Sequence, residues 1–175
     1  MSALASVSVG VVVRRYTATS PWLDYVWKPV SILEGVPSTP AWTTLRSVGS
    51  MTEYYAGSAS IDFYRTETDN YLSNLASGNP VLWIVLRPTG LSPPYDVTAV
   101  TADPAEGEAF TEAGNDIVET VPMPLAIAER LEAFVAEHDI RCGMDLRHAV
   151  DQGSVQVKED GFNVAEHHSL RVACR

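Results

Sequence analysis

The stretch SPWLDYVWKPVSIL, residues 20–33, decides the fold, because it is an expected β-strand with two tryptophans and a tyrosine and yet contains a proline. Pro29 has no N–H to donate to a neighbouring strand, so the strand is an edge strand there or carries a β-bulge. A bulge would exchange the inward and outward faces of the strand. We therefore expect Val30 and Ile32 to point into the core and Ser31 to point outward.

Other segments around this stretch also have strand patterns. Before the proline, Leu23, Tyr25 and Trp27 share the face that we expect on the core. The run PVLWIVLRP, residues 80–88, is apolar throughout and bounded by prolines, which indicates a central strand buried on both faces. Further strands are predicted at residues 7–16, 41–46, 51–55, 58–65, 95–102 and 117–123, with a hairpin turn at Ala56-Gly57 between the third and fourth of these.

Two helices have clear sequence signals at their ends. The first is expected at residues 66–77, with Thr66 as N-cap and Gly78 just past its C-terminus. The second is expected at residues 124–138, where a proline occupies the first turn and apolar residues recur at helical spacing. Residues 103–116, DPAEGEAFTEAGND, are predicted to form an acidic loop, with or without a helical turn.

These elements predict an α+β fold. We expect a curved antiparallel sheet or small barrel of about six or seven strands, with one inserted helix and one C-terminal amphipathic helix. Residues 1–140 are expected to form a single domain. Residues 141–175 are expected to be a C-terminal extension, either a hairpin or partly disordered, because they lack a strong apolar period.

The net charge of −10 comes from one part of the chain. Residues 88–140 contain eleven acidic side chains and one basic side chain, while the segments on either side are balanced. An acidic surface repels polyanions, so we predict no nucleic-acid partner and no membrane partner. The acidic face is either solvated or docks a basic protein. No apolar run of membrane-spanning length and no secretory signal is found, and the two cysteines indicate a reducing compartment, so a cytoplasmic location is predicted.

No sequence motif identifies a catalytic or cofactor site. The chain lacks the Gly-rich phosphate loops GxxxxGK[ST] and GxGxxG, and the hydrolase motif GxSxG. The histidines and cysteines of the last third have no CxxC or HExxH spacing, and the carboxylates of the first half show no paired spacing. We therefore predict no catalytic residue, no metal site and no cofactor.

Arginines and tryptophans in the first 87 residues form the one constellation with binding potential. Cationic and aromatic side chains together bind planar or anionic ligands and partner proteins well. The alternative is that the aromatics fill the core and the arginines extend along it to reach solvent. The candidate binding residues are Trp22, Trp27, Lys28, Trp42, Arg46, Arg65 and Arg87.

Five segments together resemble a known family: VGVVVRR, PWLDYVWKPVSIL, AWTTL, YYAGSASIDFYRTETDNYLSNL and PVLWIVLR. This is an uncharacterised proteobacterial family encoded beside formate dehydrogenase genes. Many of its members are labelled molybdopterin-guanine dinucleotide biosynthesis protein A. The resemblance covers roughly residues 7–140. It implies a non-catalytic accessory protein of a molybdenum- or tungsten-dependent formate dehydrogenase, which would act in assembly, cofactor maturation or subunit docking. The expected partner is a dehydrogenase subunit or a maturation factor.

The inherited label implies an alternative, a cofactor-handling enzyme such as a molybdopterin guanylyltransferase. True guanylyltransferases follow their first strand with a Gly-rich loop of the type LAGGxSxRMGxDK, and the segment YTATSPW stands at that place here. The resemblance therefore supplies no catalytic residues for this chain. A third possibility is a domain that senses an anion or a phosphorylated ligand through its arginines and tryptophans.

Overall fold

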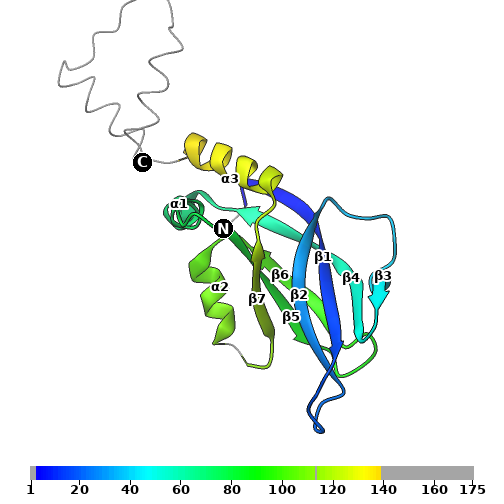
Figure 1. Ribbon diagram of the computed structural model, residues 1–175. Coiled ribbons are helices and arrows are strands. Elements are labelled where there is room, and N and C mark those ends of the chain that lie inside the picture. The colour runs from blue at the N-terminus through cyan, green and yellow to red at the C-terminus, as the bar shows by residue number, and fades with distance from the viewer. Residues whose placement is uncertain (1–2, 113, 139–175) are drawn as a thin grey trace, which may run out of the picture. The chain divides into compact units, whose positions relative to one another are not determined.

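The computed structural model describes residues 3–112 and 114–138, which form seven strands, three α-helices and one short 3-10 helix. Figure 1 labels the strands and α-helices in the order in which they occur along the chain. The elements are β1 (Ala5–Thr17), β2 (Tyr25–Glu34), β3 (Thr43–Val48), β4 (Met51–Phe63), η1 (Arg65–Glu67), α1 (Thr68–Ala76), β5 (Val81–Pro88), β6 (Tyr95–Thr101), α2 (Pro104–Thr111), β7 (Ile117–Pro122) and α3 (Leu125–His138).

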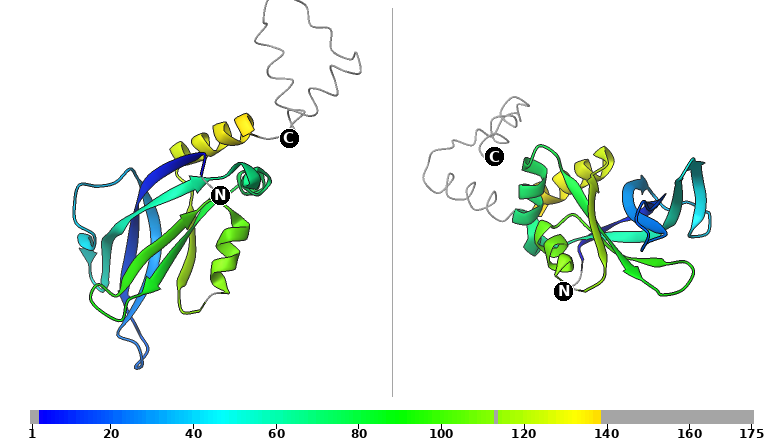
Figure 2. Two further views of the ribbon diagram at one scale, coloured as in Figure 1. Left: turned by 180° about the vertical axis from the view of Figure 1, so that it is seen from behind. Right: turned by 60° about the horizontal axis from the view of Figure 1, so that its bottom comes forward.

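The strands form two antiparallel sheets. The first has the order β2-β1-β4-β3, and the second has the order β6-β5-β7. The α+β class is as predicted, but the expected single sheet or barrel is wrong. The reason is that η1 and α1 follow β4 and lead the chain away from the first sheet, so that β5 begins a second one. The two sheets cross, with β4 beside β6 and β2 beside β7 (Figures 1 and 2).

The bulge predicted at the proline is confirmed. On β1, Val12 lies opposite Ser31 and the next residue lies opposite Pro29, so that Val30 is the extra residue of β2. Ile32 is buried, Val30 is half-buried and Ser31 is exposed, as a change of face requires. β2 is also an edge strand, which accommodates the missing N–H of the proline.

The predicted turn at Ala56-Gly57 is wrong, because β4 continues through it as one strand. Ala56 is an extra residue where the register between β4 and β1 shifts. Gly57 has a φ of +140°, a backbone conformation that side chains disfavour. The Ala-Gly pair is therefore a second bulge, which bends β4 along β1 without breaking it.

The two predicted helices are confirmed with small differences at the first. Residues 65–67 form η1, so α1 begins at Thr68 rather than at the predicted Thr66. Gly78, with a φ of +83°, ends the helix as expected. α3 begins just after Pro124, whose carbonyl accepts hydrogen bonds from the N–H groups of Ile127 and Ala128. None of α1, α2 and α3 combines the length and the apolar character that crossing a lipid bilayer requires.

Helix α2 lies within the segment predicted to be an acidic loop. Asp103 caps it, because its carboxylate accepts a hydrogen bond from the N–H of Ala105 at 2.8 Å. Gly107 in the middle of the helix lowers helix propensity, which weakened the sequence signal. A Cβ at position 107 would lie 2.2 Å from the indole of Trp83, so the glycine allows α2 to pack on β5.

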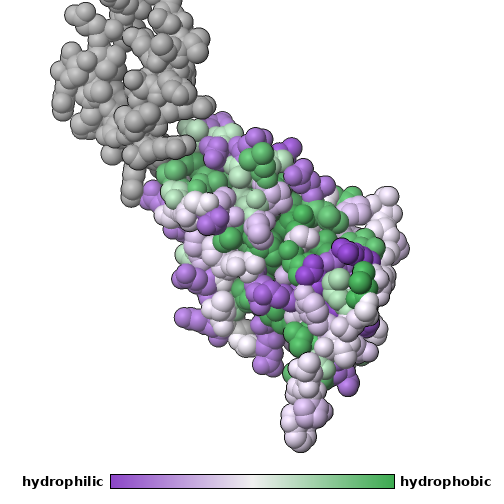
Figure 3. Space-filling model, in the orientation of Figure 1, coloured by the Kyte–Doolittle hydropathy of each residue, from purple (hydrophilic) through white to green (hydrophobic). Residues whose placement is uncertain are grey.

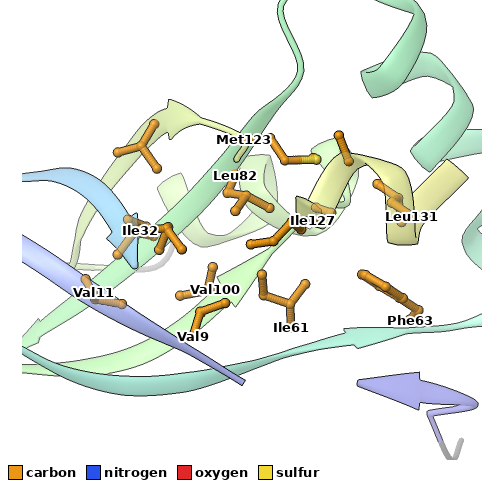
Figure 4. Packing of buried hydrophobic residues seen from close by; sticks show 14 of the residues in the cluster. Val9, Val11, Ile32, Ile61, Phe63, Leu82, Val100, Met123, Ile127 and Leu131 are labelled. Atoms are coloured by element: carbon orange, nitrogen blue, oxygen red, sulfur yellow. The ribbon is translucent and has the colours of Figure 1, made fainter. Parts of the chain in front are cut away.

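The core lies between the two sheets and α3 (Figure 4). The inner face of the first sheet contributes Val9, Val11, Ile61 and Phe63, all at most 1% exposed. α3 packs over the end of this face, with the rings of Phe134 and Phe63 5.4 Å apart. Each fully buried aliphatic or aromatic side chain stabilises the fold by about 1.5–3 kcal/mol. The second sheet and α3 add Leu82, Ile84, Leu86, Val100, Val121, Met123, Ile127, Leu131 and Val135.

The predicted extension at residues 141–175 lies outside the described residues. Residues Met1–Glu137 form one compact unit. The predicted domain boundary near residue 140 stays a prediction.

Candidate functional site

The seven candidate binding residues do not lie in one place. Trp27 and Trp42 lie together on the inner face of the first sheet, the face that also carries the core. Lys28 and Arg46 lie on its outer face, because they alternate with inner-face residues along β2 and β3. The remaining three are scattered over the loop before β2, η1 and the end of β5: Trp22, Arg65 and Arg87.

Five rings form what we call the aromatic cluster: Tyr25, Trp27, Trp42, Tyr54 and Tyr95. Trp27 is central, with ring centroids 5.7 Å from Trp42, 5.7 Å from Tyr54 and 6.0 Å from Tyr95. Tyr25 is 44% exposed, and the other four are half-buried. The prediction that Tyr25 is part of the core is therefore wrong, and so is that of Leu23, which is 59% exposed in the loop before β2.

The register of the first sheet places a cation in this cluster. Arg15 of β1 lies directly opposite Trp27 of β2 on one side and Thr52 of β4 on the other. It continues the face of Val11 and Val13, since alternate residues of a strand point the same way. The buried face of β1 therefore continues into a half-buried arginine.

The guanidinium of Arg15 lies over three rings of the cluster. Its Cζ atom is 4.3 Å from the ring centroid of Tyr25, 5.5 Å from that of Tyr54 and 5.7 Å from that of Trp27. Each such cation–π contact is worth about 0.5–2 kcal/mol, depending on exposure. Within residues 3–112 and 114–138, Arg15 forms no salt bridge and no side-chain hydrogen bond. The cation is thus oriented by rings while its N–H donors stay available.

Trp42 reaches the cluster through an unusual backbone conformation. Its φ is +66°, in the left-handed region that residues other than glycine rarely occupy. The cost of this conformation is about 1–2 kcal/mol. The N–H of Trp42 donates to the carbonyl of Tyr55, and its ring lies 6.0 Å from that of Tyr54. Such local strain is often found at functional sites.

The outer face of the same sheet has its charges mostly paired. Arg14 donates to Glu53 through Nε at 2.9 Å and to the hydroxyl of Tyr16 at 2.8 Å. Lys28 forms a salt bridge of 3.3 Å with Glu119 of β7. Arg46 lies opposite Glu53 in the register and has no salt bridge with any described residue. The two neighbouring arginines of β1 therefore differ, since Arg14 is paired and Arg15 is not.

A second row on the outer face is apolar. Val26, Tyr16, Met51 and Val48 are consecutive partners across the four strands, and the two valines at its ends are about half-exposed. Trp22, in the loop between β1 and β2, is 90% exposed. In Figure 3, hydrophobic and hydrophilic surfaces alternate over the molecule, and the projecting β1–β2 connection is near the middle of the scale.

The last two candidates lie away from the aromatic cluster. Arg87 donates to Asp116 at 2.9 Å, and this hydrogen bond raises the pKa of the guanidinium. Arg65 is exposed in η1. The candidate binding residues thus include two members of the cluster, Trp27 and Trp42, and leave out Arg15, the cation that completes it, although Arg15 is one of the arginines of the predicted strands.

No metal-binding group was found among residues 3–112 and 114–138, where no three His, Cys, Asp or Glu side chains gather as ligands would. Of the histidines and cysteines considered above, only His138 lies in this part of the chain. The prediction of no metal site therefore stays a prediction for the chain as a whole.

Comparison with known proteins identifies the family. Residues 8–141 match the family described as "Protein of unknown function (DUF3305)", which is most of the chain. The chain belongs to this family. No curated protein matches the chain. No solved structure matches it either.

Proposed function

We propose that this chain, a member of the DUF3305 family, is a non-catalytic binding protein whose contact surface is the aromatic cluster with Arg15. The observation that carries the proposal is the half-buried Arg15, whose guanidinium is held over three rings without an acidic partner in the described residues. Tryptophan, tyrosine and arginine are the residues most enriched among those that dominate binding energy in protein interfaces.

The proposed partner is a molybdenum- or tungsten-dependent formate dehydrogenase in the cytoplasm. This part of the proposal is supported by the family resemblance of residues 7–140. The accessory role would be assembly, cofactor maturation or docking to a subunit. The guanylyltransferase alternative is less well supported, because strands of nucleotide-binding α/β folds run parallel and every strand pair described here is antiparallel.

Co-purification tests the proposal. The tagged chain would be expressed in a bacterium that contains a molybdenum formate dehydrogenase, and dehydrogenase subunits would be identified in the bound fraction by mass spectrometry. We expect the Arg15→Gln variant to lose the dehydrogenase. Arg46→Gln, which removes an exposed arginine from the other face of the same sheet, should keep it. If no dehydrogenase subunit co-purifies, and a deletion strain oxidises formate normally, the proposed partner is wrong.

The second candidate is a sensor of small anions, and the unpaired Arg15 favours it as well. Two tryptophans of the cluster would report binding, because an anion at Arg15 would lie close to Trp27. Titration with sulfate, phosphate and formate, followed by tryptophan fluorescence, separates this candidate from the first. Saturable quenching by a small anion that is lost in Arg15→Gln would favour the sensor.

A further inference from the structure

We infer that Arg15 binds a carboxylate of the partner protein, carried on an Asp or Glu side chain that has an apolar side chain beside it. The inference rests on the proposed binding function and names the chemistry that the aromatic cluster recognises. It has three parts: the free donors of the guanidinium, the charge that surrounds them, and the rings that flank them.

The guanidinium is prepared for an anion that approaches its N–H groups. Tyr25, Trp27 and Tyr54 hold it through their rings, and rings of this kind accept no conventional hydrogen bond from its five N–H donors. Because no described residue accepts from these donors, an incoming group can take two of them at once. A carboxylate matches the planar fork of a guanidinium with two parallel hydrogen bonds.

The local charge favours a carboxylate over a phosphate. A phosphorylated side chain carries about −1.5 to −2 charges at neutral pH and is usually met by more than one cation. Arg15 is the only cation of the cluster. Arg14 and Lys28 are paired with Glu53 and Glu119 respectively. A single positive charge is complementary to the single negative charge of an Asp or Glu side chain.

The rings beside Arg15 favour an apolar neighbour for that carboxylate. Tyr25 is 44% exposed, and Trp27 and Trp42 are half-buried, so an apolar side chain of the partner can remove their remaining surface from water. Removing water would also strengthen the ion pair, because the attraction between charges rises as the local dielectric falls. In protein interfaces, hot-spot residues likewise lie in well-packed, water-excluded pockets.

Peptides that differ at one position test the inference on the full-length chain. The first probe is acetyl-Ser-Phe-Glu-Phe-Ser-amide, the second has Gln in place of Glu, and the third has phosphoserine there. Binding is followed by NMR through the Nε–H signal of Arg15 and the indole N–H signals of Trp27 and Trp42. We expect the Glu peptide to bind at least about 10-fold tighter than the Gln peptide, as for a charged hydrogen-bonded pair.

Variants assign this preference to the guanidinium. Arg15→Gln should abolish the difference between the Glu and Gln peptides. Arg15→Lys, which keeps the charge without the planar fork, should keep only part of it. Arg46→Gln is the matched control on the other face and should behave like the natural chain.

Three results with the purified chain would overturn the inference. The phosphoserine peptide could bind more than 10-fold tighter than the Glu peptide, or the chain could sediment with phosphatidylglycerol vesicles in an Arg15-dependent way. The third is that neither the Glu peptide nor the Gln peptide shifts these signals at millimolar concentration. Co-purification of a dehydrogenase that survives Arg15→Gln would leave the proposed partner standing while this inference fails. If no dehydrogenase co-purifies but the Glu peptide binds as expected, the partner is wrong and the recognised group is right.

Discussion

The inner face of β1 has two halves that differ in how deeply they are buried. Val9, Val11 and Val13 lie under the second sheet and are completely buried. Two residues farther on, the same face carries Arg15 among rings that are mostly half-buried. We call these the covered half and the open half. The change from valine to arginine along this face therefore coincides with a change from complete to partial burial.

The largest expected loss of stability comes from a substitution in the covered half. Replacing Phe63, which is 1% exposed, by alanine should lower the free energy of unfolding by about 3–5 kcal/mol, because it leaves a cavity beneath α3. Urea denaturation measures this loss. Trp27→Ala is the matched aromatic change in the open half and should cost about 1–2 kcal/mol, since part of that ring is already in water. Equal losses for the two variants would contradict the division into halves.

The next expected effect is a dependence of the free energy of unfolding on pH, and it comes from the buried residue Tyr71. Burial raises the pKa of Tyr71 from 10.0 to about 12, since the apolar surroundings disfavour the phenolate. Above pH 10 the unfolded chain loses this proton before the folded chain does, so Tyr71 destabilises the fold progressively between pH 10 and 12. The resulting loss in the free energy of unfolding is absent below pH 10 and approaches about 2–3 kcal/mol above pH 12.

The matched variant for this pH dependence is Tyr71→Phe. Urea denaturation from pH 9 to 12 should show a shallower fall for this variant than for the natural chain. A constant offset is also expected, because the hydroxyl that accepts the N–H of Tyr64 at 3.1 Å is lost. Parallel curves for the two proteins would show that Tyr71 titrates like an exposed tyrosine.

A smaller loss is expected where α2 covers the second sheet. Gly107→Ala adds a methyl group 2.2 Å from the Trp83 ring, so we expect destabilisation by about 1–3 kcal/mol despite the better helix propensity of alanine. Glu108→Ala at the exposed neighbouring position should change stability by less than about 0.5 kcal/mol. Thermal unfolding compares the two. Stabilisation by Gly107→Ala would mean that α2 and β5 do not pack closely.

The smallest effect on stability is expected for the open half. Arg15→Gln should lower the free energy of unfolding by about 1–2 kcal/mol, because the guanidinium contributes three partly exposed ring contacts and no salt bridge within the described residues. The same substitution should remove partner binding. A loss as large as that of Phe63→Ala would instead make Arg15 a structural residue.

Much of the fold could be predicted because local signals decided it. Pro29 indicated a bulge in an edge strand, and Gly78 indicated the end of α1. The misses have physical reasons at particular residues. Helix α2 was predicted only as a loop with or without a helical turn. Gly107 weakened the helix signal, and the reason for this glycine, its fit against Trp83, depends on tertiary packing. Ala56 and Gly57 resemble a turn in sequence, and only pairing with β1 shows that they form a bulge. The division into two sheets likewise depends on long-range pairing.

The site was predicted only in part. Density of aromatic residues pointed correctly to Trp27 and Trp42, but it could not separate them from Trp22 or Trp83, because the grouping depends on strand register. Arg15 carried a usable signal: it continues the alternating valines of β1 and so places a charge on the apolar face. The adjacent Arg14 masked that signal, since two arginines in a row resemble a solvated strand end.

The bulges of β2 and β4 also make the sheet open to change by a single residue. They flank β1 at neighbouring positions, between Val11 and Val13, and so lie within the covered half. Deleting Val30 would remove the extra residue of β2 and close the bulge, and Ser31 and Pro29 would stay opposite Val12 and Val13. Trp27 would therefore remain opposite Arg15. The edge strand can thus lose this one residue without any change in the pairs on either side of it.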